Sequence, residues 1–305
     1  MSSQADSCSM EKKFCSFDMN TCKSFILAGA CTLALAVIPS CDSARPIETE
    51  TIQFSDSTAH AYVTVMSELP AAVSGKVGKI RETLIGVMDR QMSAIAPGED
   101  GRLFPAYPGD RTKTDELFTY YRQQVMHVVD SLSRRDAADR LQYIENPTEY
   151  DFPAWGYEFN LEKTADTDRY VVFCSHNYLY MGGAHGGITG EGDLTFSKKT
   201  GQLIDSFLKP DCVTDLQPLL KKGLISYYSE FGGDPMTEKT LMEQLQIEGE
   251  EIPLPAWAPF PSEDGLTFTY QQYEIACYAD GMPSFTIPYE EIKPFLSKEA
   301  VELLF

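Results

Sequence analysis

The sequence predicts an α+β fold with two lobes, in which mainly antiparallel sheets pack against helices. Two long segments have the period of amphipathic helices, and the segments after them alternate apolar with polar residues. Strands and helices do not alternate regularly, as they would in a parallel βαβ fold. Of the 305 residues, 43% are hydrophobic and 11% aromatic, which is enough for a substantial core.

The early part of the folded chain predicts two strands and two helices. Alternation over residues 52–54 and 62–66 predicts the strands. Apolar residues spaced by threes and fours predict a first helix from Ser74 to Ile95, stopped by the Pro-Gly pair at 97–98. A polar loop then leads to a second helix, whose apolar stripe extends over residues 114–132.

From Trp155 the apolar period changes to two, which predicts a long antiparallel hairpin. The residues that share one face of each strand are Trp155, Tyr157, Phe159 and Leu161 on the first, and Tyr170, Val172, Cys174, His176 and Tyr178 on the second. A further strand contains Leu194 and Phe196. It is followed by a turn with Gly201 at a position that needs positive φ, and then by a strand at Leu203 and Ile204.

The C-terminal third predicts helices, an extended loop and short strands. In chain order these are a helix over 216–231, a short helix over 237–245, a proline-containing loop over 253–261, strands at 266–270 and 273–277 joined through a bulge at Gln271-Gln272, a turn at Asp280-Gly281, a strand at 285–287 and a final helix capped by Ser297.

A glycine-rich corner follows the second strand of the hairpin. Gly182, Gly183, Gly186 and Gly187 allow positive φ or a close approach of backbone to another segment. His185 lies on this bend, where an imidazole can bind a metal or transfer a proton. The alternative is that His185 bonds to backbone and locks the corner, because no second histidine accompanies it.

The N-terminal 40 residues have the features of a bacterial lipoprotein signal peptide. Their apolar stretch, residues 25–37, is shorter than the about 20 residues of a membrane span and is followed by small residues before Cys41. We expect lipidation at Cys41 and a polar tether over residues 41–50. Two alternatives remain for this segment. Translation can begin at Met19, and ordinary signal-peptide cleavage would leave Cys41 as a free thiol.

The strong negative charge of the chain narrows the classes of partner that it can bind. The chain has 45 acidic and 25 basic residues, for a net charge of −20. This charge repels phosphate backbones, so we expect no nucleic-acid partner. Cationic partners fit the charge, although an acidic surface also serves solubility alone.

Three segments together resemble one known family. The glycine corner, the hairpin at 194–201 and the run from Leu266 to Tyr289 are similar to the RsiV-like family, a domain of unknown function shared by the anti-sigma factor RsiV and the region preceding the catalytic domain of the deacetylase PdaC. The resemblance implies a PdaC-like N-terminal domain over 51–187 and an RsiV-like C-terminal domain over 188–305. It also implies that the C-terminal lobe is similar to a subdomain of the Hsp70 ATPase.

Sequence motifs for catalysis and cofactors do not accompany this resemblance. The sequence has no nucleophile elbow, phosphate loop or HExxH motif, so we expect no catalytic residue and no cofactor. Cys174, Cys212 and Cys277 lack the spacing of a zinc site, and we expect no metal. The sequence does not decide whether Cys174 and Cys277 form a disulfide in an oxidising envelope.

These observations predict a non-enzymatic, lipid-anchored protein of the cell envelope that binds a polypeptide or cell-wall ligand. The predicted ligand-contacting residues are Tyr180, His185, Tyr273 and Tyr278. A lysozyme-like cationic protein and peptidoglycan are the candidate ligands. The lipid on Cys41 would place the protein on a bacterial membrane, at the outer membrane or the periplasmic face. The alternatives are a cell-wall hydrolase or deacetylase-type enzyme that uses His185, and a purely structural envelope component.

Overall fold

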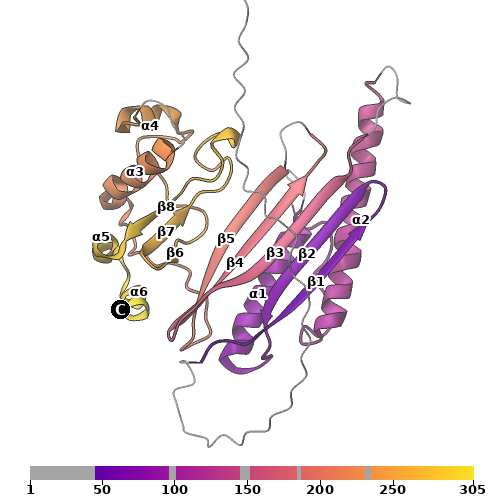
Figure 1. Cartoon of the computed structure of the whole chain (residues 1–305), viewed down its shortest axis with the longest axis horizontal. Helices are drawn as coiled ribbons and strands as arrows, with labels where there is room; N and C mark the ends of the chain where they lie inside the picture. Colours follow the sequence, from indigo (N-terminus) through magenta and orange to yellow (C-terminus); the bar gives the residue numbers. More distant parts are fainter. Residues whose placement is uncertain (1–44, 96–100, 145–151, 184–186, 231–234) are drawn as a thin grey trace, which may run out of the picture. The chain divides into compact units, whose positions relative to one another are not determined.

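The computed structural model describes residues 45–95, 101–144, 152–183, 187–230 and 235–305 (Figure 1). The first set of elements is β1 (Thr49–Ser57), β2 (Ala61–Pro70), α1 (Gly75–Ser93), α2 (Thr114–Leu141), β3 (Trp155–Asp166), β4 (Tyr170–Tyr180) and β5 (Gly187–Ser197). The second set is α3 (Val213–Glu230), α4 (Glu238–Gln244), β6 (Phe260–Pro261), β7 (Gly265–Thr269), η3 (Tyr278–Asp280), β8 (Ser284–Pro288), α5 (Tyr289–Ile292), η4 (Lys293–Phe295) and α6 (Lys298–Leu304). The predicted α+β class is confirmed.

The first seven elements form a five-stranded sheet in the order β1-β2-β3-β4-β5. Neighbouring strands are antiparallel except β2 and β3, which are parallel and are connected through α1 and α2. The two helices lie on one face of this sheet (Figure 1). The predicted hairpin of β3 and β4 and both predicted helices are confirmed.

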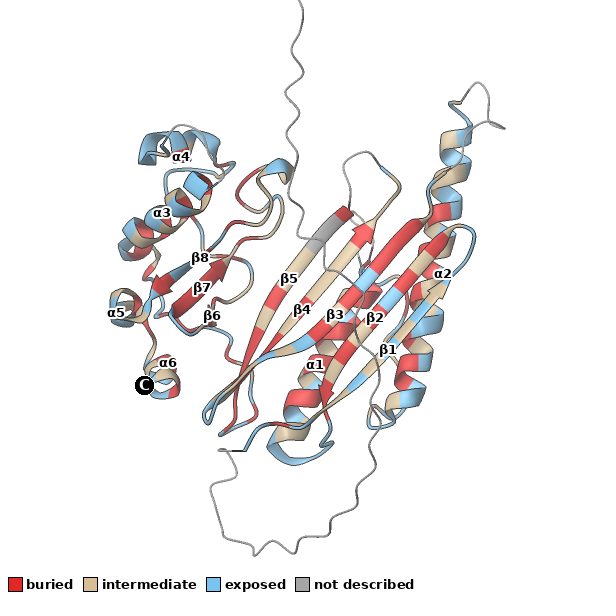
Figure 2. Cartoon of the chain, in the orientation of Figure 1, coloured by how far each residue is buried: buried red, intermediate tan, exposed pale blue. Residues whose placement is uncertain are grey.

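The first core lies between the sheet and these helices (Figure 2). Strand side chains that point to the helices are almost fully buried; they include Val63, Val65, Tyr157, Phe159, Leu161, Val171 and Phe173. The helices contribute Leu84, Met88, Tyr121 and Val125. In β3 the predicted face is the buried one. In β4 the predicted face, which includes Cys174 and Tyr178, points away from the helices, because Val171 and Phe173 occupy the core.

A second core lies in the C-terminal part of the chain, between the sheet β6-β7-β8 and α3. Phe268 and Phe285 stack with ring centroids 5.6 Å apart. Gly223 of α3 lies against the Phe285 ring, and a side chain at this position would overlap it. The predicted Ser297 cap is confirmed, since its hydroxyl accepts a hydrogen bond from Ala300 N. The likeness of this lobe to an Hsp70 subdomain stays a prediction.

Two predicted strands are wrong. Residues 273–277 do not extend β7: Gln271 N donates to Glu274 Oε2 at 2.7 Å, and Tyr273 has φ 65°, so the chain turns tightly instead. The Glu274 carboxylate thus accepts the hydrogen bond from Gln271 N that a neighbouring strand would otherwise accept. The predicted strand at Leu203 is a single bridge to Phe196, although Gly201 before it has the expected positive φ of 73°.

The chain is fixed to the sheet before residue 51, where we expected the fold to begin. Ile47 is buried, and its N–H donates to Asp166 Oδ2 at 2.7 Å. Lys198 Nζ donates to Arg45 O and to Asp166 Oδ1, each at 2.7 Å. Residues 45–47 are therefore part of the packed structure.

The thiols of Cys174, Cys212 and Cys277 are free, so the open question of a Cys174–Cys277 bridge is answered in the negative. No helix in the described part of the chain combines the length and apolar character needed to cross a membrane. Cys41 lies outside the described residues, and its lipidation stays a prediction. The predicted domain boundaries also stay predictions, although the change from one core to the other falls between Phe196 and Ile204.

Asp166 gives a first prediction about stability. Burial raises the pKa of Asp166, but hydrogen bonds from Lys198, Lys163 and Ile47 outweigh it and lower the pKa overall. A carboxyl with a lowered folded pKa contributes stability above its unfolded pKa of about 3.9, and this contribution is lost as the pH falls through the folded pKa. Asp166→Asn should lower the free energy of unfolding at pH 7 by about 3–5 kcal/mol, because Lys198 stays buried without its counter-charge.

Denaturant unfolding between about pH 3 and pH 7 measures this effect. The variant should also lose part of the acid dependence that the parent shows below about pH 4. Asp168→Asn is the matched control, because Asp168 is an exposed neighbour in the same turn. Equal stability of the two variants would show that the Asp166 contacts are not important for folding.

Candidate functional site

The outer edge of β5 is covered by side chains from the C-terminal part of the chain. The Gln271 amide makes two hydrogen bonds to the backbone of Glu191, accepting from Glu191 N at 2.8 Å and donating to Glu191 O at 2.7 Å. The Tyr278 hydroxyl donates to Gly187 O at 2.8 Å. These bonds take the place of a sixth strand, so this part of the edge is not available for pairing with another chain.

The segment that supplies these bonds also presents two aromatic rings. Tyr273 is 63% exposed, and its ring centroid lies 5.8 Å from that of Tyr278. Tyr273 has a positive φ of 65°, which is uncommon for a bulky residue. Glu274 supports this conformation, because its carboxylate accepts hydrogen bonds from Gln271 N and Ala256 N. The turn therefore holds an exposed aromatic side chain in a defined place.

Three more tyrosines lie on the face of the five-stranded sheet that points away from α1 and α2. The register pairs Tyr62 with Gly156, Gly156 with Tyr180, and Tyr180 with Gly187. A side chain at Gly156 would overlap the Tyr62 ring, and one at Gly187 would overlap the Tyr178 ring. These two glycines thus let the rings lie across neighbouring strands. We call Tyr62, Tyr178, Tyr180, Tyr273 and Tyr278 the tyrosine surface.

The phenols of Tyr62 and Tyr178 are neutral hydrogen-bonding groups. Burial raises the pKa of Tyr62, and the Glu158 carboxylate and the phenols of Tyr178 and Tyr180 raise it further. Burial also raises the pKa of Tyr178, where a backbone hydrogen bond at Gly187 acts in the opposite direction. The tyrosine surface therefore combines apolar ring faces with hydroxyl groups, which suits a polypeptide or saccharide ligand.

The structure describes three of the four predicted ligand-contacting residues. Tyr180, Tyr273 and Tyr278 all lie on the tyrosine surface, and ligand binding by them stays a prediction. His185 and Gly186 lie outside the described residues. Of the predicted corner, Gly182 has φ 69° and lies beside Pro153, Gly183 is exposed, and Gly187 begins β5.

Sequence reasoning missed one member of the tyrosine surface. Tyr62 lies on β2, far from the glycine corner in sequence, and only the parallel pairing of β2 with β3 brings it to Gly156. A single tyrosine in an alternating strand carries no signal of this contact. This contact follows only from the order in which the strands pair.

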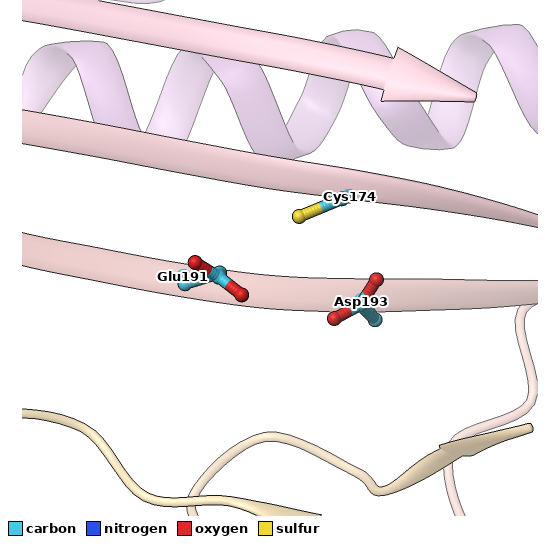
Figure 3. A group of neighbouring side chains, drawn as sticks. All are labelled: Cys174, Glu191 and Asp193. Atoms are coloured by element: carbon cyan, nitrogen blue, oxygen red, sulfur yellow. The ribbon is translucent and has the colours of Figure 1, made fainter. Parts of the chain in front are cut away.

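A second group of side chains lies on the same face of β4 and β5 (Figure 3). Cys174 Sγ and carboxylate oxygens of Glu191 and Asp193 all lie within 4.8 Å of one another. Cys174 is paired with Asp193, and Glu191 precedes Asp193 by two residues, so the three side chains point to one face. We call them the Cys174 cluster. No metal was expected at Cys174, and its carboxylate neighbours were missed.

Burial and like charge shape the acidity of the Cys174 cluster. Burial raises the pKa of Asp193 to about 7, and the Glu191 carboxylate adds to this effect. Burial also raises the pKa of the Cys174 thiol, with further contributions from Asp193 and Glu191. Asp193 and Cys174 thus resist ionisation, first because they are buried and second because their neighbours are also acidic.

Comparison with known proteins finds a match to one family model within the C-terminal part of the chain. Residues 207–290 match the model of a family described as a protein of unknown function, DUF3298. A DUF3298 domain of unknown function therefore lies in this chain. No curated protein matches the chain. The match does not test the resemblance to the RsiV-like family, which stays a prediction.

Two crystal structures of DUF3298 family proteins share the fold. The protein from Bacteroides fragilis NCTC 9343 has a TM-score of 0.63 and 18% identity, and the match covers 84% of this chain and 97% of that one. The protein from Pseudomonas aeruginosa PAO1 has a TM-score of 0.52 and 14% identity, with 85% and 98% covered. The likeness therefore extends well beyond the residues that match the DUF3298 model.

The link between the DUF3298 domain and β5 gives a second prediction. Gln271→Ala removes both hydrogen bonds to the Glu191 backbone. We expect the free energy of unfolding to fall by about 1–3 kcal/mol and the Glu191 amide to exchange faster with solvent. Hydrogen exchange and denaturant unfolding measure the two effects. Gln246→Ala is the control, because Gln246 is exposed. Unchanged exchange at Glu191 would contradict a role of Gln271 in closing this edge.

Proposed function

We propose that this chain is a non-enzymatic, lipid-anchored protein of the bacterial cell envelope that binds a polypeptide or cell-wall ligand on its tyrosine surface. The observation that carries the proposal is the arrangement of five tyrosines from three distant parts of the sequence in the tyrosine surface. The sequence features of residues 1–41 support the lipid anchor, and the sequence lacks recognisable catalytic motifs.

Rigid, half-exposed tyrosines support binding for an energetic reason. Tyrosine supplies a large apolar area together with a hydroxyl, and it loses little conformational entropy because it has few rotatable bonds. On the tyrosine surface, Gly156 and Gly187 make room for the rings, and the Tyr278 hydroxyl is already bonded to Gly187 O. A ligand would therefore meet a surface that needs little further ordering.

The charge of the chain favours a cationic protein among the candidate ligands. Its net charge of −20 attracts a positively charged partner over a long distance at low ionic strength. Glu158 adds a negative group beside Tyr62 and Tyr178. A cationic, lysozyme-like protein would contact both the tyrosine rings and the negative charge of this surface. A neutral cell-wall saccharide would contact only the rings.

The third prediction concerns this binding. Full-length protein in detergent should bind lysozyme in calorimetry, and the affinity should fall as salt rises. Tyr273→Ser should weaken binding by about five- to thirtyfold, which corresponds to about 1–2 kcal/mol for an aromatic contact residue. Tyr143→Ser is the matched control, because Tyr143 is 88% exposed but lies at the end of α2.

Three outcomes would contradict parts of the proposal. Absence of binding at low ionic strength would exclude the lysozyme-like ligand. Equal effects of the Tyr273 and Tyr143 variants would show that binding does not use the tyrosine surface. Turnover of peptidoglycan fragments that is lost in His185→Ala would replace binding with the enzyme alternative.

A further inference from the structure

We propose that Cys174, Glu191 and Asp193 form a binding site for a divalent transition-metal cation, with Zn²⁺ as the best match. This inference does not depend on the ligand of the tyrosine surface. It differs from the expectation of no metal, which came from the absence of a recognisable ligand spacing along the sequence. Pairing of β4 with β5 brings these ligand types together although they are far apart in sequence.

The geometry of the Cys174 cluster is the first argument. Its sulfur and two carboxylate groups come from adjacent strands and lie within 4.8 Å of one another (Figure 3). Zinc binds sulfur at about 2.3 Å and oxygen at about 2.0–2.2 Å, so tetrahedral ligands lie about 3.5 Å apart. Small rotations of the side chains of Glu191 and Asp193 would close this difference without moving the strands.

The local charge is the second argument. Glu162 of β3 is paired with Cys174 and adds another carboxylate to the cluster. In the part of the chain that the structure describes, no basic side chain forms an ion pair with Glu162, Glu191 or Asp193. Glu191 and Asp193 are partly buried, and partly buried carboxylates without a counter-charge destabilise a fold, so a bound cation would offset this cost.

Unpartnered oxygen atoms near the cluster are the third argument. Thr195 follows Asp193 by two residues on the same face of β5; it is 2% exposed, and its Oγ1 has no hydrogen-bond partner among the described residues. Asn160 lies on β3, opposite His176, and its buried Oδ1 also has no partner there. Buried acceptors are normally satisfied, and both residues stand two positions along a strand from an acidic residue on the same face, Thr195 from Asp193 and Asn160 from Glu162.

The donor types select the class of cation. Thiolate favours zinc and other transition metals over Mg²⁺ and Ca²⁺, which prefer oxygen ligands alone. On binding, the Cys174 thiol loses its proton to solvent and the sulfur forms a bond to the metal, without any change of oxidation state. Three protein ligands leave the fourth position of a tetrahedral zinc to water.

The experiment uses the full-length protein, freed of metal with a chelator and titrated with Co²⁺ and then Zn²⁺. Co²⁺ bound to a thiolate shows a sulfur-to-metal charge-transfer band in the near ultraviolet, which reports Cys174 directly. We expect this band in the parent protein and its loss in Cys174→Ser. Because removal of an outer-shell partner already weakens metal binding by about 10–100-fold, Cys174→Ser and Asp193→Asn should each weaken Zn²⁺ binding by at least about a hundredfold.

Controls separate this site from the other two thiols of the described residues and from misfolding. Cys212→Ser and Cys277→Ser should keep the band and the affinity, since both residues lie outside the cluster. Asp193→Asn keeps every cysteine and nearly the same side-chain volume, so circular dichroism should show an unchanged fold. Zn²⁺ should raise the melting temperature of the parent more than that of either cluster variant. An unchanged band and affinity in Cys174→Ser, or no metal binding by the parent, would overturn the proposal.

Discussion

The structure depends on how the outer edge of β5 is closed. An unpaired edge strand exposes a row of N–H and C=O groups that can pair with other chains. Here Gln271 bonds both backbone groups of Glu191, Tyr278 bonds Gly187 O, and Ile204 N donates to Thr195 O at 2.8 Å. One strand therefore belongs to the first sheet by its inner edge and contacts the DUF3298 domain by its outer edge. The two hydrophobic cores are joined through these hydrogen bonds to backbone and through apolar contacts, since Trp257 packs against the first core beside Gly192 and Tyr170 packs against the second.

The same strand pairing explains why both candidate sites lie on one face. The helices α1 and α2 cover one side of the five-stranded sheet, and alternate residues of β4 and β5 must point to the other side. That side is not covered by α1 and α2, and it carries tyrosines at one end and the Cys174 cluster further along. Gly156 and Gly187 remove the side chains that would otherwise separate the rings. The sites thus use the face that the first core leaves available.

The sequence predicted elements well where one local rule was sufficient. Period two indicated the β3–β4 hairpin, and the spacing of apolar residues indicated α1 and α2. Local rules failed where a side-chain hydrogen bond or a distant strand pairing decides the conformation. Alternation at 273–277 suggested a strand, but the Glu274 carboxylate bonds the backbone of Gln271 and Ala256 and turns the chain. The Cys174 cluster was hidden for a related reason, because Cys174 meets Asp193 only through the register of β4 and β5. No spacing along the sequence expresses that register.

The two proposed sites are connected by covalent structure and by hydrogen bonds. Gln271 holds the backbone of Glu191, a proposed metal ligand, and stands two residues before Tyr273 of the tyrosine surface. A cation that fixes the Glu191 side chain would therefore also fix the strand position to which Gln271 is bonded. The tight turn at Tyr273, with its positive φ, needs such support, because an isolated chain rarely adopts it. Order at the Cys174 cluster and order at the exposed Tyr273 ring thus depend on the same two hydrogen bonds.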